Sequence, residues 1–132
     1  EAKVSPLSMG YLVCAPGGAV GEVGKADLIH LDDTDKVREY AVCAEYFGFD
    51  LLYLEAGSGA DTPVSSDLIQ AAKGACDLTL IVGGGIRDGQ SARRAVHAGA
   101  DWVVTGSLTE EFDDPDELQR TLSQLISNIG ST

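Results

Sequence analysis

The chain has 132 residues, of which 44% are hydrophobic, so it is long enough for one domain with a real core and too apolar for a disordered protein. Its formal net charge of −12 disfavours nucleic acid as a partner, because binding to phosphate backbones needs basic patches. No apolar run approaches the ~20 residues of a membrane span, and no basic-then-apolar start predicts a signal peptide. The dispersed acidic residues favour a halophilic protein, adapted to high salt, with an ordinary acidic protein as the alternative.

Four short apolar segments predict the strands of a parallel sheet. Each segment is nearly continuous in hydrophobic residues and is closed by glycine, which is typical of strands buried on both faces. In chain order the segments are residues 10–15, 51–55, 78–82 and 102–105.

Helical spacing of apolar residues predicts one helix after each strand. Ser65 and Asp88 suit helix starts, Thr34 or Asp35 could cap the first helix, and Pro115 suits a first helical turn. The expected helices are residues 33–47, 65–75, 88–98 and 115–129. Four strand–helix repeats predict an α/β fold of βαβ units, but a whole (β/α)8 barrel needs about 250 residues. We therefore expect residues 1–132 to form a single (β/α)4 half-barrel.

The three cysteines predict neither a disulfide framework nor a structural zinc site. Their number is odd and no CxxC pair occurs. Cys14 and Cys43 fall in apolar patterns and are expected to be buried thiols. Free thiols favour a reducing compartment, and hence the cytoplasm.

Two glycine-rich turns predict a phosphate site at the carboxyl ends of the last two strands. Gly83, Gly84 and Gly85 follow the third strand, where glycines let a backbone approach an anion closely; a tight strand–helix turn is the alternative. Gly106 and Ser107 follow the fourth strand. In many barrels the loops after strands seven and eight hold a phosphate jointly, so the four strands are assigned as strands five to eight.

Glu55 ends the second strand and is the candidate catalytic residue. A carboxylate at the end of a buried strand is costly unless it binds something, and Tyr53 points to the same side by strand alternation. Glu55 could accept hydrogen bonds from substrate hydroxyls or remove a proton from one, with structural acceptance of loop amides as the alternative. The segment predicts a site for a small phosphorylated polyol.

Two further groups are less informative. Arg87 could neutralise a phosphate or simply begin a solvated helix. His30 lies in a loop with Asp27, Asp32 and Asp33; a metal cluster is the minor alternative there, because the spacing and the partners are loose.

Three segments together resemble the archaeal geranylgeranylglyceryl phosphate synthase family, to which the bacterial heptaprenylglyceryl phosphate synthases are similar. They are residues 53–60 (YLEAGSGA), 81–87 (IVGGGIR) and 104–106 (VTG). The resemblance implies the carboxy-terminal half, strands five to eight, of a TIM barrel. It also implies a prenyltransferase of ether-lipid biosynthesis, which uses Mg²⁺ to move a geranylgeranyl group from its diphosphate to the 3-hydroxyl of sn-glycerol 1-phosphate.

The resemblance also implies a set of substrate-binding residues, in which Glu55 orients the glycerol hydroxyls and takes the proton. The residues implied to line the glycerol phosphate are Tyr53, Leu54, Glu55, Ala56, Gly57, Ser58 and Gly59. Those implied to hold its phosphate are Gly84, Gly85, Gly106 and Ser107.

The family's first four strands, with their Mg²⁺ ligands and much of the prenyl channel, have no counterpart here. We therefore expect no metal ligand in this chain, and no activity from it without the half that binds geranylgeranyl diphosphate. Open sheet edges predict pairing with a second copy or with a complementing half-barrel. Transient contact with a membrane surface is expected for a lipid product. The alternative function is a non-catalytic phosphopolyol-binding half-barrel, natural or a fragment; an isomerase or synthase of another pathway fits segment 53–59 poorly.

Overall fold

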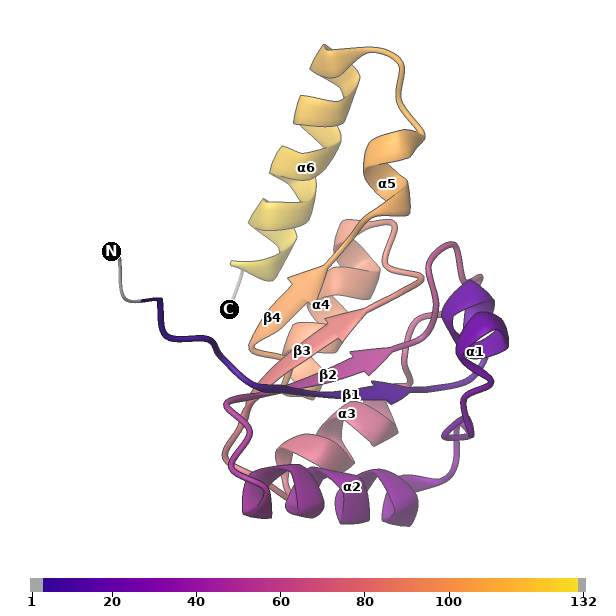
Figure 1. Ribbon diagram of the computed structural model, residues 1–132. Helices are drawn as coiled ribbons and strands as arrows, with labels where there is room; N and C mark the ends of the chain where they lie inside the picture. Colours follow the sequence, from indigo (N-terminus) through magenta and orange to yellow (C-terminus); the bar gives the residue numbers. More distant parts are fainter. Residues whose placement is uncertain (1–3, 131–132) are drawn as a thin grey trace.

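The computed structural model describes residues 4–130 and contains a sheet of four parallel strands (Figure 1). The strands lie side by side in chain order, so that each one pairs with its neighbours in the sequence. The predicted α/β class with parallel strands is confirmed, and the strand ends differ from the predicted ones by no more than one or two residues. The strands are β1 Met9–Val13, β2 Leu51–Glu55, β3 Thr79–Gly83 and β4 Trp102–Val104.

Helices α2, α3 and α4 pack along one face of the sheet, and α6 packs against α4 (Figure 1). These four helices were predicted; the short α1 and α5 were not. No helix within residues 4–130 is both long enough and apolar enough to cross a membrane. The helices are α1 Gly18–Gly24, α2 Thr34–Tyr46, α3 Ser66–Lys73, α4 Gly89–Ala98, α5 Ser107–Glu110 and α6 Pro115–Ile129.

Local capping explains where three of the predicted helices begin. Ser65 accepts a hydrogen bond from the Leu68 amide at the start of α3. Asp88 and Ser91 form a reciprocal capping box at the start of α4. Pro115 occupies the first turn of α6. The predicted cap of α2 was wrong, because Asp33 takes the capping position and its side chain makes no capping hydrogen bond.

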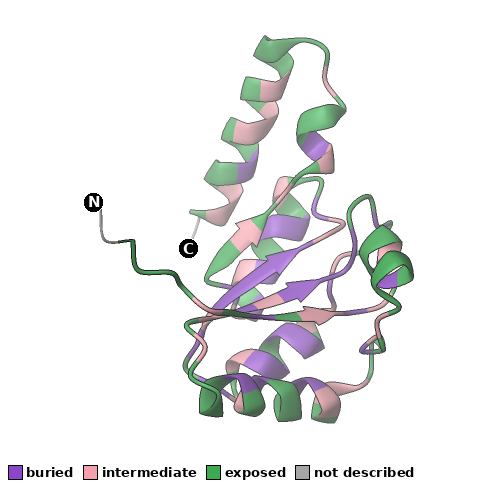
Figure 2. Cartoon of the chain, in the orientation of Figure 1, coloured by how far each residue is buried: buried purple, intermediate pink, exposed green. Residues whose placement is uncertain are grey.

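The two faces of the sheet differ in what covers them. Leu52, Leu54, Leu80 and Val82 point toward the helices and have no exposed surface. Figure 2 shows this buried layer running through β2, β3 and the facing sides of the helices. The opposite face, here called the inner face, consists by alternation and register of Met9, Tyr11, Val13, Leu51, Tyr53, Glu55, Thr79, Ile81, Gly83, Trp102 and Val104.

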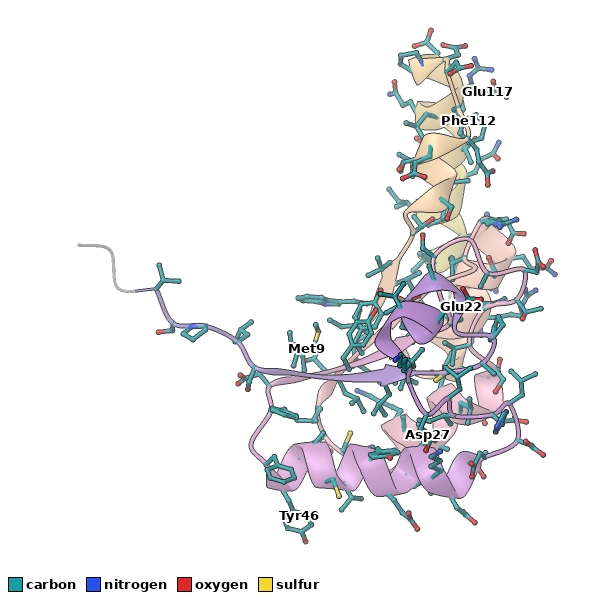
Figure 3. The ribbon with its side chains drawn as sticks, turned by 45° about the vertical axis from the view of Figure 1, so that its right-hand side comes forward. Met9, Glu22, Asp27, Tyr46, Phe112 and Glu117 are labelled. Atoms are coloured by element: carbon teal, nitrogen blue, oxygen red, sulfur yellow. The ribbon has the colours of Figure 1, made fainter. Side chains whose placement is uncertain are left out.

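The inner face has no second layer within residues 4–130. Tyr11 is 44% exposed and Trp102 is 56% exposed, although both lie on strands of a parallel sheet. Figure 3 shows the Met9 side chain on the side of β1 away from α2. Parallel sheets are normally covered on both faces, so this arrangement is that of an opened half of a barrel.

The edge of the sheet at β1 is open too, except at its carboxyl end, where the Ile29 amide donates to the Val13 carbonyl at 2.9 Å. An apolar groove runs along this edge between β1 and α2, where Phe47 is 80% exposed. Cys43 lies in the groove and is exposed, so the prediction of a buried Cys43 was wrong: its side of α2 has no neighbour within residues 4–130. Cys14 is fully buried as predicted, and all three thiols are free.

Candidate functional site

A pocket lies at the carboxyl ends of β2, β3 and β4, where ligands bind in parallel α/β folds. We call it the rim pocket. It brings together seven of the predicted site residues: Tyr53, Glu55, Ser58, Gly84, Gly85, Gly106 and Ser107. Ile86, Arg87, Val104 and Thr105 complete its lining.

The other four predicted residues do not line the rim pocket. The Leu54 side chain is fully buried on the helix-facing side of β2, and Ala56 is fully buried just after that strand. Gly57 donates its amide proton to Glu55. Gly59 donates its amide proton to the Ser107 hydroxyl at 3.1 Å. Some residues of segment 53–59 therefore line the pocket, while others support it through backbone hydrogen bonds or buried side chains.

Glu55 is 8% exposed, and its carboxylate is held by two donors, one from the following loop and one from the neighbouring strand. Its Oε1 accepts from the Gly57 amide at 2.6 Å, and its Oε2 accepts from the Tyr11 phenol at 3.1 Å. The structural contact with a loop amide that the sequence left as an alternative is therefore present. The same carboxylate also lines the rim pocket, so the two interpretations are compatible.

Two stacked tyrosines flank this carboxylate on the inner face. The rings of Tyr11 and Tyr53 lie 4.9 Å apart between centroids, at 20° to each other. Burial, with the charge and hydrogen bonding of Glu55, raises the pKa of Tyr11 to about 12. The same causes in the same order, with a further contribution from Tyr11, raise the pKa of Tyr53. Both phenols therefore remain protonated at neutral pH and act as hydrogen-bond donors.

Sequence reasoning missed Tyr11. A signal existed, because Tyr11 interrupts an apolar strand segment as Tyr53 does, and the two are register partners across β1 and β2. Recognising the pair required the register, which the sequence alone did not supply.

The glycines after β3 allow close backbone contact between loops. Gly84 and Gly85 have φ values of +83° and +68°, which favour glycine. A Cβ on Gly84 would lie 2.5 Å from Glu55 Oε1 and 2.6 Å from the Gly57 nitrogen. The turn after β3 is thereby pressed against the turn after β2, and any larger residue would separate them.

Hydrogen bonds tie the three rim loops together. Arg87 donates from Nη2 to the Gly59 carbonyl at 2.9 Å, which joins the loops after β3 and β2. Thr105 donates to the Ile86 carbonyl at 2.7 Å, which joins the loops after β4 and β3. The Gly59–Ser107 bond links the loops after β2 and β4. Arg87, for which the sequence left two roles open, thus lines the rim pocket and braces it.

The lining of the rim pocket does not fit a divalent-cation site. Glu55 is the one carboxylate in the lining of the rim pocket. Within residues 4–130, no three His, Cys, Asp or Glu side chains lie close enough to hold a metal ion. In the loop around His30, Asp27 instead pairs with Lys36 at 2.8 Å.

Comparison with known proteins identifies relatives of this chain. Residues 1–125 match the model of the PcrB family. Geranylgeranylglyceryl phosphate synthases from Thermoplasma volcanium and Methanococcoides burtonii are 45% and 43% identical to it over 96% and 98% of the chain. The chain spans about half the length of these curated relatives (50% and 51%).

Solved structures agree with this relationship. The chain superposes with a TM-score of 0.91 on a crystal structure of (S)-3-O-geranylgeranylglyceryl phosphate synthase from Thermoplasma acidophilum in complex with its substrate sn-glycerol 1-phosphate. That protein is 40% identical, and the match covers 98% of this chain and 51% of that one. The wild-type Thermoplasma volcanium enzyme gives a TM-score of 0.89 at 45% identity, over 96% of this chain and 49% of that one.

Proposed function

Because the chain belongs to the PcrB family, we propose that it is the acceptor-binding half of a geranylgeranylglyceryl phosphate synthase, the half that holds sn-glycerol 1-phosphate. The observation that carries this proposal is the composition of the rim pocket. Its lining combines glycine turns and a hydroxyl with a buried carboxylate and a phenol. A phosphate monoester of a small polyol presents an anion and hydroxyls that match these two sets of groups.

The glycine turns are the proposed phosphate end of the site. Gly84 and Gly85 after β3, and Gly106 and Ser107 after β4, line the rim pocket, and their backbone amides are the proposed donors to the anion. Arg87 lines the same pocket and adds a positive charge, although its Nε also lies 4.0 Å from Glu111 Oε1. These groups offer donors and charge to an anion without a lysine.

Glu55 and Tyr53 are the proposed hydroxyl end. A carboxylate offers about four acceptor positions, and the Gly57 amide and the Tyr11 phenol use two of them. The remaining capacity suits a hydroxyl of the glycerol. In the proposed reaction the 3-hydroxyl oxygen bonds to C1 of the prenyl group as the bond from C1 to diphosphate breaks. Glu55 takes the hydroxyl proton.

The donor, geranylgeranyl diphosphate, and Mg²⁺ belong to the half of the enzyme that this chain does not include. The resemblance places the metal ligands there, and the described residues do not fit a cation site. The role proposed for this chain is therefore to bind and orient the acceptor, and to receive its proton.

We propose that a complementary four-stranded half covers the inner face and closes the sheet at β1 and β4. The relatives are about twice as long as this chain, and its inner face and the groove at β1 are uncovered. A second copy suits the surface less well, because two copies would together carry twice −12, or −24, and repel each other. Sedimentation of the chain alone and mixed with the first half of a relative distinguishes the partners: a homodimer that excludes the added half would contradict this proposal.

The cellular setting follows from the same proposal. A lipid product implies transient contact with a membrane surface as it leaves. The three free thiols support a reducing, cytoplasmic environment.

A non-catalytic phosphopolyol-binding module is the second candidate. It is favoured by the single carboxylate in the rim pocket and by the half-length of the chain. Ether-lipid formation, assayed with and without the complementing half, separates the two candidates. Activity only in the mixture supports the enzyme; activity of this chain alone would refute the division into acceptor and donor halves.

Calorimetric titration with sn-glycerol 1-phosphate tests the site itself. Gly84→Asp adds bulk and negative charge to the turn that is proposed to hold the phosphate. Because its Cβ would press on Glu55 and Gly57, it should also displace that turn, and it should abolish binding. Gly24→Asp is the matched control, since Gly24 has open space around its Cα and does not line the rim pocket. Unchanged affinity in Gly84→Asp would defeat the phosphate assignment.

A further inference from the structure

The three consecutive glycines after β3 are not equivalent. Gly84 and Gly85 adopt positive φ, which explains glycine at both positions. Gly83 does not, since it is the last residue of β3 and has ordinary strand conformation. Its backbone would accept any residue, so the reason for glycine there must be space.

The space at Gly83 is filled by the phenol of Tyr53. A Cβ built on Gly83 would collide with the Tyr53 hydroxyl, and would lie 2.9 Å from Cζ and 3.2 Å from Cε1 of the same ring. All three of the nearest atoms belong to Tyr53. The hydroxyl therefore crosses from β2 to lie against the backbone of β3, beside the rim pocket that both Tyr53 and Glu55 line.

Tyr53 is also restrained on its other sides. Its ring stacks on Tyr11. Burial, and after it the nearby charge of Glu55, raises the pKa of the Tyr53 phenol. A methyl group at position 83 could be accommodated only if the ring swung off this stack, toward the open inner face, and took the hydroxyl away from Glu55.

We propose that Gly83 is a positioning residue that sets the hydroxyl-binding end of the site through Tyr53, and that it takes no part in holding phosphate. This inference rests on the proposed function. It divides the glycine triplet between the two ends of one ligand: Gly83 makes room for the phenol that meets the polyol, while Gly84 and Gly85 form the turn that meets the anion. Selectivity for a phosphorylated polyol over phosphate alone then depends on Gly83.

Titrations with two probes test this division. sn-Glycerol 1-phosphate reports both ends of the site, whereas inorganic phosphate reports the anion end alone. Gly83→Ala should weaken binding of glycerol phosphate about tenfold, the effect of one lost hydrogen bond in a site, and leave binding of inorganic phosphate unchanged. Gly24→Ala, which adds the same methyl group in open space, should match the wild type for both probes.

Tyr53→Phe provides a second, independent readout because it adds no atoms and should fold. It should also weaken the binding of sn-glycerol 1-phosphate and leave the binding of inorganic phosphate unchanged. The double variant should be no weaker than Gly83→Ala alone, since both changes remove the same hydroxyl from the site. If Gly83→Ala does not fold, Tyr53→Phe alone still tests whether the phenol serves the hydroxyl end and not the phosphate end.

Three results would overturn the inference. They are equal losses for both probes in Gly83→Ala, no selective loss in Tyr53→Phe, and additive losses in the double variant. Failure of the wild-type chain to bind either probe would instead count against the proposed function, so the two failures are distinguishable.

Discussion

The Tyr11 phenol donates a hydrogen bond to Glu55 Oε2 at 3.1 Å, which connects the first strand of the sheet to the carboxylate at the end of the second. Tyr11 does not line the rim pocket, yet it fixes one oxygen of the group proposed to receive the substrate proton. The Gly57 amide in the following loop and the Tyr11 phenol on the neighbouring strand thus fix the orientation of the Glu55 carboxylate together.

Tyr11→Phe should therefore weaken the site without dismantling it. One donor to Glu55 is lost, and we expect affinity for sn-glycerol 1-phosphate to fall about fivefold and the free energy of unfolding to fall by about 1 kcal/mol. Calorimetry and urea denaturation measure the two effects. Tyr46→Phe, at an exposed tyrosine at the end of α2, is the control and should change neither (Figure 3). An unaltered affinity in Tyr11→Phe would show that Gly57 alone orients the carboxylate.

Alkaline pH should destabilise the chain through the two inner-face tyrosines. The pKa of Tyr11 rises from 10.0 to about 12 on folding, so the folded state holds its proton more tightly than the unfolded state. Stability from this source is fully present below about pH 10 and is lost as the pH rises toward 12. Denaturation midpoints measured across this range should fall with pH.

Glu55→Gln tests the cause of that pKa shift. Removing the charge should lower the pKa of Tyr11 toward the ordinary phenol value, but only part of the way, because burial is the larger cause. Phenolate absorbance during a pH titration follows the change, with Tyr46→Phe subtracting one exposed tyrosine. A pKa that does not move in Glu55→Gln would mean that the charge of Glu55 does not reach the Tyr11 phenol.

Asp88 should stabilise α4, the helix that follows the proposed phosphate turn. Its carboxylate accepts from the Ser91 amide at 2.6 Å and completes a capping box. Asp88→Ala should cost about 1 kcal/mol of unfolding free energy, whereas Asp88→Asn, which keeps an acceptor, should cost much less. Urea denaturation at neutral pH compares the variants, and equal losses in both would contradict a capping role.

The same carboxylate should make α4 sensitive to acid. The hydrogen bond from the Ser91 amide is the main cause that holds the pKa of Asp88 below 3.8. Its contribution is present above the unfolded pKa and is lost as the pH falls through the lower folded value. The stability difference between wild type and Asp88→Ala should therefore shrink in acid, which denaturation at a series of pH values would reveal.

High salt should stabilise the chain. A net charge of −12 on 132 residues produces self-repulsion that counter-ions screen. We expect the urea midpoint to rise steadily from low salt to molar KCl. Salt can stabilise a protein by screening its charges or by a general solvent effect, and a neutral osmolyte such as sucrose acts only in the second way. A charge-reduced variant should therefore lose most of its stabilisation by KCl and keep its stabilisation by sucrose.

Much of this fold could be read from the sequence because its strands are buried and closed by glycine. The second strand was predicted with its bounds, and segment 53–59 identified the loop that carries Glu55. The glycine turns were also recognisable, since consecutive glycines after a strand are unusual without a close backbone approach. These signals come from residues close together in the sequence, so they can be recognised without a structure.

What the sequence could not supply are the contacts between distant residues. The Tyr11–Glu55 bond joins residues 44 positions apart, and the place of Tyr53 above Gly83 depends on strand register. Helix α1 was missed because Gly18, Gly21 and Gly24 lower its helical propensity. Tertiary packing stabilises this helix instead. The helix packs closely on Leu28, because a Cβ on Gly21 would lie 3.1 Å from the Leu28 side chain.

The bonds between the rim loops, from Gly59 to Ser107 and from Arg87 to Gly59, have a thermodynamic consequence. Loops that are already fastened to one another lose little conformational entropy when a small anion arrives. Binding energy is then not consumed in organising the protein. The rim pocket can thus be preorganised before any ligand arrives.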